Sequence, residues 1–316
     1  MPRVVVTARG FGSGRSDPIG ALRAAGLEVV EGDLEHDLEA LRAPLASAEG
    51  WIAGTWPVTA AHLDLAPRLR VLARHGTGTD AVDVAAATAR GVVVTNTPGA
   101  NAEAVADHAL ALMLAALRHV VAADAGVRNG DWATRRGREL GELTVGVVGF
   151  GRVGRGVVRR AAAGFGARVL AHDPYIDEVM IRAGGAEPVP LLALAEHADV
   201  VSLHLPGGGR PVVDAALLAR MKPDAVLVNT ARGSLVDEPA VAAALAAGRL
   251  GAAAVDVLAE EPPRNSPLLS APRVIVTPHI AAQTYGAADR MGMESVREVI
   301  RVLGGEPPLH PVLAPR

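Results

Sequence analysis

Three side chains in the second half of the chain supply the groups that a reduced nicotinamide needs beside it to reduce a 2-keto acid. Arg232 is a cation, Glu261 a carboxylate and His279 an imidazole. A guanidinium can hold a substrate carboxylate through two parallel hydrogen bonds, which lysine cannot reproduce. An imidazole can carry a proton near neutral pH, and a carboxylate beside it favours its protonated form. The combination predicts an acid/base site for a 2-keto or 2-hydroxy acid.

The positions of these residues along the chain favour this interpretation over ordinary structural roles. Taken singly, His279 is more often a structural histidine, and Glu261 is more often part of a solvated acidic pair. Each of the three, however, follows a short apolar run, and these runs span residues 226–228, 252–255 and 274–276. The carboxyl ends of parallel strands meet at one edge of a sheet, where α/β proteins bind ligands. We therefore expect the three side chains to gather at one site.

A glycine-rich turn earlier in the chain predicts a dinucleotide site. The sequence Gly149-Phe150-Gly151-Arg152-Val153-Gly154 directly follows the apolar run 144–148. Gly149 and Gly151 allow a tight turn and close approach of the backbone to a pyrophosphate, and Gly154 lets the next helix pack on the strand. The helix is expected to begin with Arg152 and Val153, directly after the turn. Its N-terminus is therefore expected to face the phosphates. A glycine turn without a cofactor is the alternative, and the strand–turn–helix context makes it the weaker one.

The cofactor type follows from an acidic residue downstream of this turn. Asp173 ends the next predicted strand, about 20 residues further on, where the fingerprint requires a carboxylate. A carboxylate there accepts hydrogen bonds from the ribose hydroxyls and repels a 2′-phosphate, so NAD is expected rather than NADP. The glycines between Gly10 and Gly14 lack this spacing and the downstream acid. We expect only a flexible strand–helix loop there.

Composition excludes several other classes of protein. The chain has 316 residues, which predicts about two domains, and half of them are hydrophobic. A formal charge of -3 gives no basic surface of the kind that nucleic-acid-binding proteins show. The absence of cysteine excludes disulfides, thiolate metal sites and cysteine nucleophiles, and we expect no metal. The N-terminus enters a strand without a signal peptide, and the longest apolar run, 109–117, is too short to span a bilayer. We expect a cytoplasmic protein without a membrane partner.

Apolar runs alternate with amphipathic stretches along the whole chain, which predicts an α/β fold with parallel sheets covered on both faces. The expected strands lie at 4–7, 27–30, 50–53, 69–73, 92–95, 144–148, 168–171, 200–203, 225–228, 252–255 and 274–276. The expected helices include 18–25, 38–48, 84–89, 153–163 and 238–247. A single long helix is expected from Ala102 to Asp124, with Asn101 as its N-cap. Trp132, in the polar connection that follows, is expected to anchor that loop by packing.

The motifs together resemble the D-2-hydroxyacid dehydrogenases, in particular the branch similar to phosphoglycerate dehydrogenase, over nearly the whole chain. The segments that carry the resemblance are Arg74 to Gly78, Asn96 to Gly99, Gly149 to Gly154, His204 to Pro206, Asn229 to Asp237, Asp256 to Pro262 and Thr277 to Ile280. The family implies two doubly wound parallel-sheet domains, a Rossmann NAD-binding domain inserted in a flavodoxin-like substrate domain. On this basis residues 1–97 and 285–316 are expected to form the substrate domain and residues 98–284 the NAD-binding domain.

The resemblance also implies roles for individual residues. Arg232 would bind the substrate carboxylate and carbonyl, His279 would be the acid/base and Glu261 its partner. The implied cofactor contacts are Asp256, Thr230 and the backbone of Ala231 on the nicotinamide side, with His204 and Pro206 on the adenosine side. The backbone amides of Gly76, Thr77 and Gly78 resemble the carboxylate-binding turn of the other domain. A homodimer formed through the cofactor domains is implied as well.

Departures from the family pattern bear on the substrate. Relatives acting on phosphoglycerate place a basic residue about where Ala53 falls, and residues 53–57 contain none. Glyoxylate, hydroxypyruvate or a short aliphatic keto acid is therefore the expected substrate. D-3-phosphoglycerate dehydrogenase is the alternative within the class, without an appended regulatory domain because the chain ends at Arg316. Trp56 either lines the pocket or packs in the core, and Gln283 either reaches the cleft or faces solvent.

A function of another class is a NAD(H)-sensing binding protein similar to a co-repressor. Such a protein keeps the nucleotide fingerprint without needing turnover. The joint presence of Arg232, Glu261 and His279 favours the enzyme.

Overall fold

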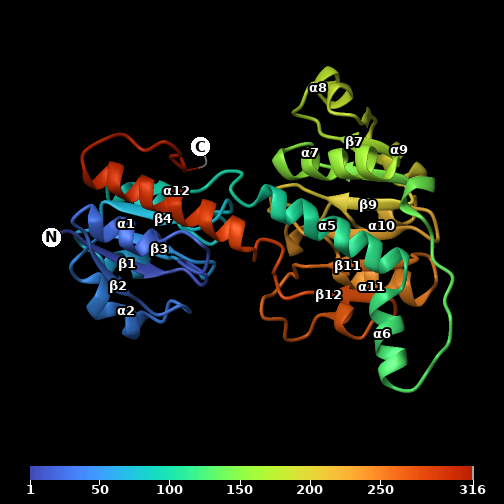
Figure 1. The fold of residues 1–316 in the computed structure, drawn as a ribbon, viewed down its shortest axis with the longest axis horizontal. Coiled ribbons are helices and arrows are strands. Elements are labelled where there is room, and N and C mark those ends of the chain that lie inside the picture. Colours follow the sequence, from blue (N-terminus) through green and yellow to red (C-terminus); the bar gives the residue numbers. More distant parts are fainter. Residues whose placement is uncertain (315–316) are drawn as a thin grey trace. The chain divides into compact units, whose positions relative to one another are not determined.

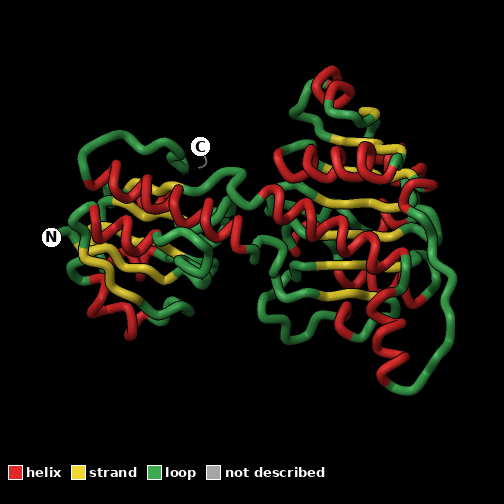
Figure 2. Tube along the Cα trace, viewed as in Figure 1, coloured by secondary structure: helices red, strands yellow, loops and turns green. Residues whose placement is uncertain are grey.

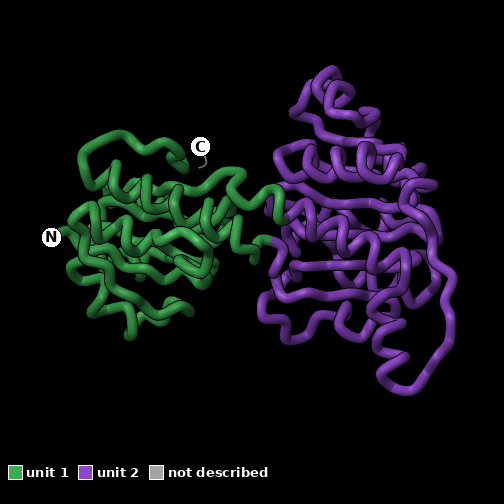
Figure 3. Tube along the Cα trace, viewed as in Figure 1, with its two compact units in different colours: residues 1–104, 282–316 green, residues 105–281 purple. Residues whose placement is uncertain are grey.

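The computed structural model describes residues 1–314 and divides the chain into two compact units. Unit 1 comprises Met1–Ala104 and Ala282–Arg316, and unit 2 comprises Val105–Ala281 (Figure 3). Unit 2 is thus inserted in unit 1. The boundaries predicted from the sequence are 97/98 and 284/285. Residues 315–316, at the end of the predicted segment 285–316, lie outside the described residues. The first boundary falls later because Ala100 and Ala104 pack with Ala287 and Met291 of unit 1.

Unit 1 is built on a five-stranded parallel sheet in the flavodoxin-like order β2-β1-β3-β4-β5 (Figure 1). Its strands are β1 (Arg3–Thr7), β2 (Glu28–Glu31), β3 (Ala48–Ala53), β4 (Val71–Arg74) and β5 (Val93–Thr95). Its helices are α1 (Pro18–Ala24), α2 (Leu38–Leu45), α3 (Ala60–Asp64), α4 (Val84–Ala89) and α12 (Tyr285–Leu303). Successive strand residues face opposite sides. Val4 therefore packs in a cluster with Val299 of α12, whereas Val5 packs in a separate cluster with Leu41 of α2.

A buried polar network lies inside unit 1. The Thr7 hydroxyl lies 2.7 Å from His36 Nε2 and accepts from Trp51 Nε1 at 2.9 Å. His36 Nδ1 lies 3.0 Å from the Pro57 carbonyl oxygen, which can only accept. His62 Nε2 lies 2.8 Å from the carbonyl oxygen of His36. The pattern assigns the proton of His36 to Nδ1 and leaves Nε2 to accept from Thr7. Burial lowers the pKa of His36, and the nearby His62 lowers it further. The hydrogen bonds with Pro57 and Thr7 act in the opposite direction but do not outweigh burial.

Unit 2 contains a seven-stranded parallel sheet in the order β12-β11-β10-β9-β6-β7-β8. Its strands are β6 (Thr144–Val148), β7 (Arg168–His172), β8 (Glu187–Pro188), β9 (Val200–Leu203), β10 (Val226–Asn229), β11 (Ala252–Val255) and β12 (Val274–Val276). Figure 2 draws strands yellow and helices red. The chain order reverses between β6 and β9, which is the switch point of a Rossmann sheet. Strand β8 was not predicted from the sequence.

Helices cover both faces of this sheet. They are α5 (Ala102–Leu117), α6 (Val120–Arg128), α7 (Arg152–Arg159), α8 (Glu178–Ala183), α9 (Leu191–His197), α10 (Ala215–Leu218) and α11 (Glu238–Ala246). Short helical segments are η1 (Leu140–Glu142), η2 (Arg160–Gly164), η3 (Gly233–Leu235) and η4 (Pro267–Leu269). Helices α5 and α7 share one core cluster with Val145 and Val147. Helices α9, α10 and α11 share another with Val148.

The prediction of one helix from Ala102 to Asp124 is wrong. Helix α5 ends at Leu117 and α6 begins at Val120, with a bend of 61° between them. The residue before α6, His119, has a left-handed φ of 55°. Helix α5 is embedded in the core, whereas α6 buries none of its residues, so the helix loses its support where the core ends. Within residues 1–314 no single helix is long and apolar enough to cross a membrane, and α5 with α6 meets the test only as a bent pair.

The expectation for Trp132 is also wrong. Its side chain is 83% exposed in the single chain, so it does not anchor its loop by packing. The connecting segment around it, residues 128–139, is rich in arginine and glycine.

Candidate functional site

Three neighbouring strands of unit 2 bring the candidate site together at their carboxyl ends. Strands β10, β11 and β12 are parallel, and Asn229 pairs with Val255, which in turn pairs with Val276. The backbone ladder continues past the strands, since the amide of Asp256 donates to Asn229 and the amide of Thr277 donates to Val255, both at 2.9 Å. The loops that follow these strands carry Arg232, Glu261 and His279. We call them the Arg232 loop (residues 230–237), the Glu261 loop (residues 257–266) and the His279 loop (residues 277–281).

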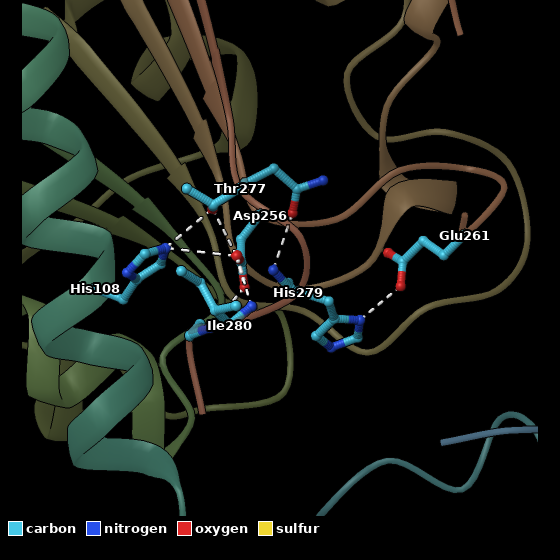
Figure 4. Close-up of polar contacts among 9 residues, drawn as sticks. His108, Asp256, Glu261, Thr277, His279 and Ile280 are labelled. Carbon is cyan, nitrogen blue, oxygen red and sulfur yellow. Dashed lines mark hydrogen bonds and ion pairs between the residues drawn. The ribbon is translucent and has the colours of Figure 1, made fainter. Parts of the chain in front are cut away.

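His279 and Glu261 form a direct pair, with 2.6 Å between Nδ1 and Oε2 (Figure 4). The other carboxylate oxygen of Glu261 accepts from the amide of Leu258 at 3.0 Å. Burial alone would raise the pKa of Glu261, but the bond and charge of His279 and the Leu258 amide together lower it. A carboxylate can only accept, so Nδ1 carries the proton. Nε2 is thereby left to exchange a proton with a ligand, and the side chain of His279 is 41% exposed.

A buried carboxylate shapes the turn that presents His279. Asp256 accepts from the Thr277 hydroxyl at 2.6 Å and from the amides of Ile280 and Ala281 at 2.9 and 2.8 Å (Figure 4). His279 has a φ of 52°, and its amide donates to the Asp256 carbonyl at 2.9 Å. An imidazole in left-handed backbone is uncommon, so this turn needs support from its surroundings. Asp256 supplies it; the nicotinamide contact implied for this residue stays a prediction.

His108, on α5, also faces this carboxylate, with 3.5 Å between its Nε2 and Asp256 Oδ1 and 3.1 Å to the Thr277 hydroxyl (Figure 4). Burial alone would raise the pKa of Asp256, but the bonds from His108, Thr277 and the two amides together lower it. The sequence carried no signal for His108, because nothing in its helix indicates which strand end it meets.

Arg232 is fixed within its own loop. The side chain of Asn229 accepts from the Ala231 amide at 3.0 Å and donates to the Arg232 carbonyl at 2.9 Å. The Arg232 guanidinium donates to the Ala231 carbonyl at 2.7 Å. The next residue, Gly233, approaches the Glu261 loop so closely that a Cβ there would lie 2.0 Å from the carbonyl carbon of Leu258. The Arg232 loop and the Glu261 loop are therefore packed against each other.

The glycine turn after β6 has the shape that a dinucleotide requires. Gly149 has a φ of 98°, and a Cβ on it would lie 2.5 Å from the His204 carbonyl oxygen. A Cβ on Gly154 would lie 2.0 Å from the Gly149 carbonyl oxygen, so only glycine allows this helix–strand contact. A Cβ on Gly151 would instead meet no atom within 4 Å. Open space thus adjoins the N-terminus of α7, where Arg152 and Val153 begin the helix, and a pyrophosphate fits there.

Asp173 and His204 follow the two strands that flank β6 in the sheet. The carboxylate of Asp173 accepts from the amides of Phe150 and Tyr175 at 2.8 and 2.9 Å, which ties it to the glycine turn. His204 Nε2 lies 2.9 Å from the Ser202 hydroxyl, and burial lowers the pKa of His204 to about 3. His204 is therefore neutral at physiological pH. Pro206, also predicted to contact the adenosine, lies in the loop that follows β9.

A cavity of about 390 Å³ adjoins Asp173 at the carboxyl ends of β7 and β8. Its lining residues are Ala171, His172, Asp173, Pro174, Ile176, Glu178, Ile181, Pro188, Val189 and Pro190. The acidic side chains Asp173 and Glu178 are among them, while lysine and arginine are absent from this lining.

The turn predicted to bind a carboxylate through its amides lies in unit 1, after β4. Gly76 has a φ of 140°. The Thr77 carbonyl accepts from the Asn96 side chain at 2.7 Å, and the Thr77 hydroxyl donates to the Thr97 carbonyl at 3.1 Å. The two motifs Arg74 to Gly78 and Asn96 to Gly99, which carry the resemblance, therefore meet in one local structure. Because this turn and the His279–Glu261 pair belong to different units, the substrate-binding role of Gly76, Thr77 and Gly78 stays a prediction.

Comparison with known proteins identifies the same family for the sequence and the fold. Residues 110–281 match the family described as "D-isomer specific 2-hydroxyacid dehydrogenase, NAD binding domain". A D-3-phosphoglycerate dehydrogenase of Mycobacterium bovis is 46% identical over 253 residues, which are 79% of this chain and 48% of the relative. The chain thus spans about half the length of the first curated relatives it matches.

Two further proteins match over most of their own length. A glyoxylate reductase of Korarchaeum cryptofilum is 41% identical over 263 residues, covering 80% of this chain and 79% of that protein. The solved structure of a NADPH-dependent glyoxylate/hydroxypyruvate reductase from Sinorhizobium meliloti has a TM-score of 0.85 and 31% identity, covering 99% of this chain and 98% of that one.

Proposed function

Because the chain belongs to the family of D-isomer specific 2-hydroxyacid dehydrogenases, we propose that it interconverts a small 2-keto acid and the corresponding D-2-hydroxy acid with NAD(H). The observation that carries this proposal is the 2.6 Å contact between His279 Nδ1 and Glu261 Oε2, which leaves Nε2 of a half-exposed imidazole for proton transfer. A binding protein without turnover has no need of such a pair.

In the proposed reaction the bound nicotinamide supplies or accepts the hydride. In reduction, Nε2 of protonated His279 donates a proton to the carbonyl oxygen of the keto acid, and Glu261 stabilises the imidazolium. In oxidation, neutral His279 takes the hydroxyl proton. Arg232 binds the carboxylate of the substrate and orients the carbonyl carbon. Reduction is therefore expected to prefer lower pH than oxidation.

We propose NAD rather than NADP as the preferred cofactor, although the Sinorhizobium meliloti relative is NADPH-dependent. The carboxylate of Asp173 lies at the glycine turn, and a 2′-phosphate beside it would meet a negative charge. Neutral His204 provides no compensating cation, and neither does the lining of the adjacent cavity.

The proposed substrate is a small unphosphorylated keto acid such as glyoxylate or hydroxypyruvate. Ala53 lies at the end of β3 and is fully buried. An alanine at this position offers no cation to a phosphate group. Phosphoglycerate is the second candidate, supported by the identity to the mycobacterial enzyme.

The test is incubation of the pure protein with NADH and a panel of 2-keto acids while absorbance at 340 nm is followed. We expect oxidation of NADH by glyoxylate or hydroxypyruvate, and little reduction of NAD by D-3-phosphoglycerate in the reverse assay. Tight binding of NADH without turnover of any panel member would contradict the proposed enzyme activity and favour a NAD(H)-sensing protein.

We propose a second copy of this chain as its partner, in line with the homodimer that the resemblance implies. Helix α6 buries none of its residues, and Val120, Val121 and Val127 on it are each about half exposed. The indole ring of Trp132 follows in the same segment and is almost wholly exposed. Exposed apolar side chains gathered in one segment are typical of a protein interface, and symmetric dimers are the commonest assemblies.

A further inference from the structure

A second carboxylate, that of Glu238, is buried behind the Glu261 loop. Glu238 is the first residue of α11 and is only 7% exposed. Its Oε1 accepts from the Ala259 amide at 2.7 Å, and its Oε2 accepts from the Ser266 hydroxyl at 2.6 Å. Ala259 and Ser266 lie on either side of Glu261 in the sequence. One side chain therefore holds the loop at two points that bracket Glu261.

Ordinary helix capping does not account for this arrangement. Asp237 already caps α11 by accepting from the Ala240 amide at 3.1 Å. Burying a carboxylate is costly unless its oxygens are hydrogen-bonded, and a helix N-terminus lowers that cost only in part. Both carboxylate oxygens of Glu238 accept hydrogen bonds from the Glu261 loop. The carboxylate thus connects the helix that follows the Arg232 loop to the loop that carries the partner of His279.

The loop that carries Glu261 needs such support. Its local anchor is a bond from the Leu258 amide within the same loop, which fixes the side chain to the loop but not the loop to the sheet. On the other side of the pair, the His279 loop is held by Asp256. We infer that Glu238 is a positioning residue that holds the Glu261 carboxylate within hydrogen-bond distance of His279. The inference rests on the proposed function for its kinetic consequences, but the geometry it concerns exists without substrate.

Two variants of Glu238 separate the contact from the charge. In Glu238→Gln the amide oxygen can accept from Ala259 and the amide nitrogen can donate to Ser266 Oγ, so the clamp remains although the charge is lost. In Glu238→Ala both contacts are lost. Glu298 offers a matched control, because it is also buried and accepts from the amides of Leu309 and His310 in unit 1. Glu298→Ala removes a comparable carboxylate clamp that does not hold the Glu261 loop.

The first measurement uses the protein without substrate. A proton held between His279 Nδ1 and Glu261 gives a downfield resonance in NMR spectra of protein labelled with ¹⁵N-histidine, assigned by its absence from His279→Gln. We expect this resonance to persist in Glu238→Gln and Glu298→Ala and to be lost from Glu238→Ala. Its persistence unchanged in Glu238→Ala would overturn the inference.

The second measurement is kinetic. A displacement of about 1 Å in a reacting group can cost about 10²-fold in rate, so we expect kcat for keto-acid reduction to fall by that order in Glu238→Ala. The pH at which reduction falls to half its maximum should move lower, because the imidazolium loses the carboxylate beside it. Affinity for NADH should stay within twofold. Glu298→Ala should change neither kcat nor the pH profile.

A weaker variant decides the matter if Glu238→Ala does not fold. Ser266→Ala removes one of the two contacts, and we expect an intermediate loss of kcat with a shift of the pH profile in the same direction. A normal pH profile and a normal resonance in Ser266→Ala would then contradict the inference. Absence of turnover in the wild-type protein would contradict the proposed function instead, and the NMR comparison would still decide the role of Glu238.

Discussion

At the scale of single residues, the chemistry depends on which side-chain atoms already form hydrogen bonds within the protein. Glu261 commits one oxygen to a backbone amide and the other to His279, and His279 commits Nδ1 to Glu261. Nε2 has no hydrogen-bond partner among residues 1–314, so it is the atom available to a substrate. General acid catalysis by an imidazole typically contributes about 10²–10⁴ in rate.

His279→Gln is therefore expected to reduce kcat by about 10²–10⁴-fold, because glutamine cannot carry a proton near neutral pH. NADH binding, followed by fluorescence, should remain within twofold of wild type. His197→Gln, at an exposed histidine on α9, serves as the control and should leave kcat unchanged. A His279→Gln variant with near wild-type kcat would remove His279 from the mechanism.

Asp173→Asn tests the cofactor preference, since it removes the charge while keeping an oxygen for one of the two backbone amides. Loss of a like charge near a 2′-phosphate is expected to raise the kcat/KM ratio of NADPH to NADH by about tenfold or more. Asp177→Asn changes an exposed cap on α8 instead and should leave the ratio as it is. An unaltered ratio in Asp173→Asn would show that Asp173 does not discriminate between the cofactors.

At the scale of secondary-structure elements, the polar network of unit 1 depends on a single protonation state. His36 Nε2 accepts from Thr7, and protonation would place two donors against each other. The pKa of His36 is lowered by burial, so the unfolded chain binds more protons than the folded one. The stabilisation is complete above about pH 6.5 and is lost as the pH falls towards the folded pKa. His75, whose pKa burial lowers to about 4, contributes with the same sign.

Urea unfolding is accordingly expected to show a lower free energy of unfolding at pH 5.5 than at pH 7.5. Fluorescence of buried Trp51 reports on unit 1 in this experiment. His36→Gln should reduce the difference between the two pH values, and His75 should retain part of it. If the variant shows the full wild-type difference, His36 is not its source.

The elements also show how far sequence reasoning reaches. The alternation of apolar runs and amphipathic stretches predicted both parallel sheets, and the loops after β10, β11 and β12 carry the predicted Arg232, Glu261 and His279. Those residues were predictable because strand ends in a parallel sheet share one edge. His108 was not predictable, because its contact joins segments far apart in sequence. The support from Glu238 was not predictable either, because nothing in the sequence shows which loop the first residue of α11 contacts. The bend at His119 was missed because it follows from where the core ends, not from a glycine or proline.

At the scale of the whole molecule, the family accounts for the architecture, and the exposed apolar side chains of unit 2 motivate the proposed dimer. The fold consists of a flavodoxin-like unit interrupted by a Rossmann unit, each with its own core clusters. The exposed Val120, Val121 and Val127 of α6 and the exposed Trp132 all belong to unit 2.

Light scattering coupled to gel filtration is expected to give twice the mass of one chain. Trp132→Asp places a charge in the proposed interface and should shift the mass towards that of a single chain at micromolar concentration. Tyr175→Asp is the matched control, because Tyr175 is also an exposed aromatic residue of unit 2 but lies outside the α6 segment. A single-chain mass for the wild-type protein would refute the dimer.

The contact between Gly233 and Leu258 has a practical consequence for redesign. No side chain fits at Gly233 without pushing the Arg232 loop away from the Glu261 loop, since the nearest backbone atoms lie 2.0 Å from where its Cβ would be. Substitution of Gly233 is therefore expected to separate the two loops and to lower activity.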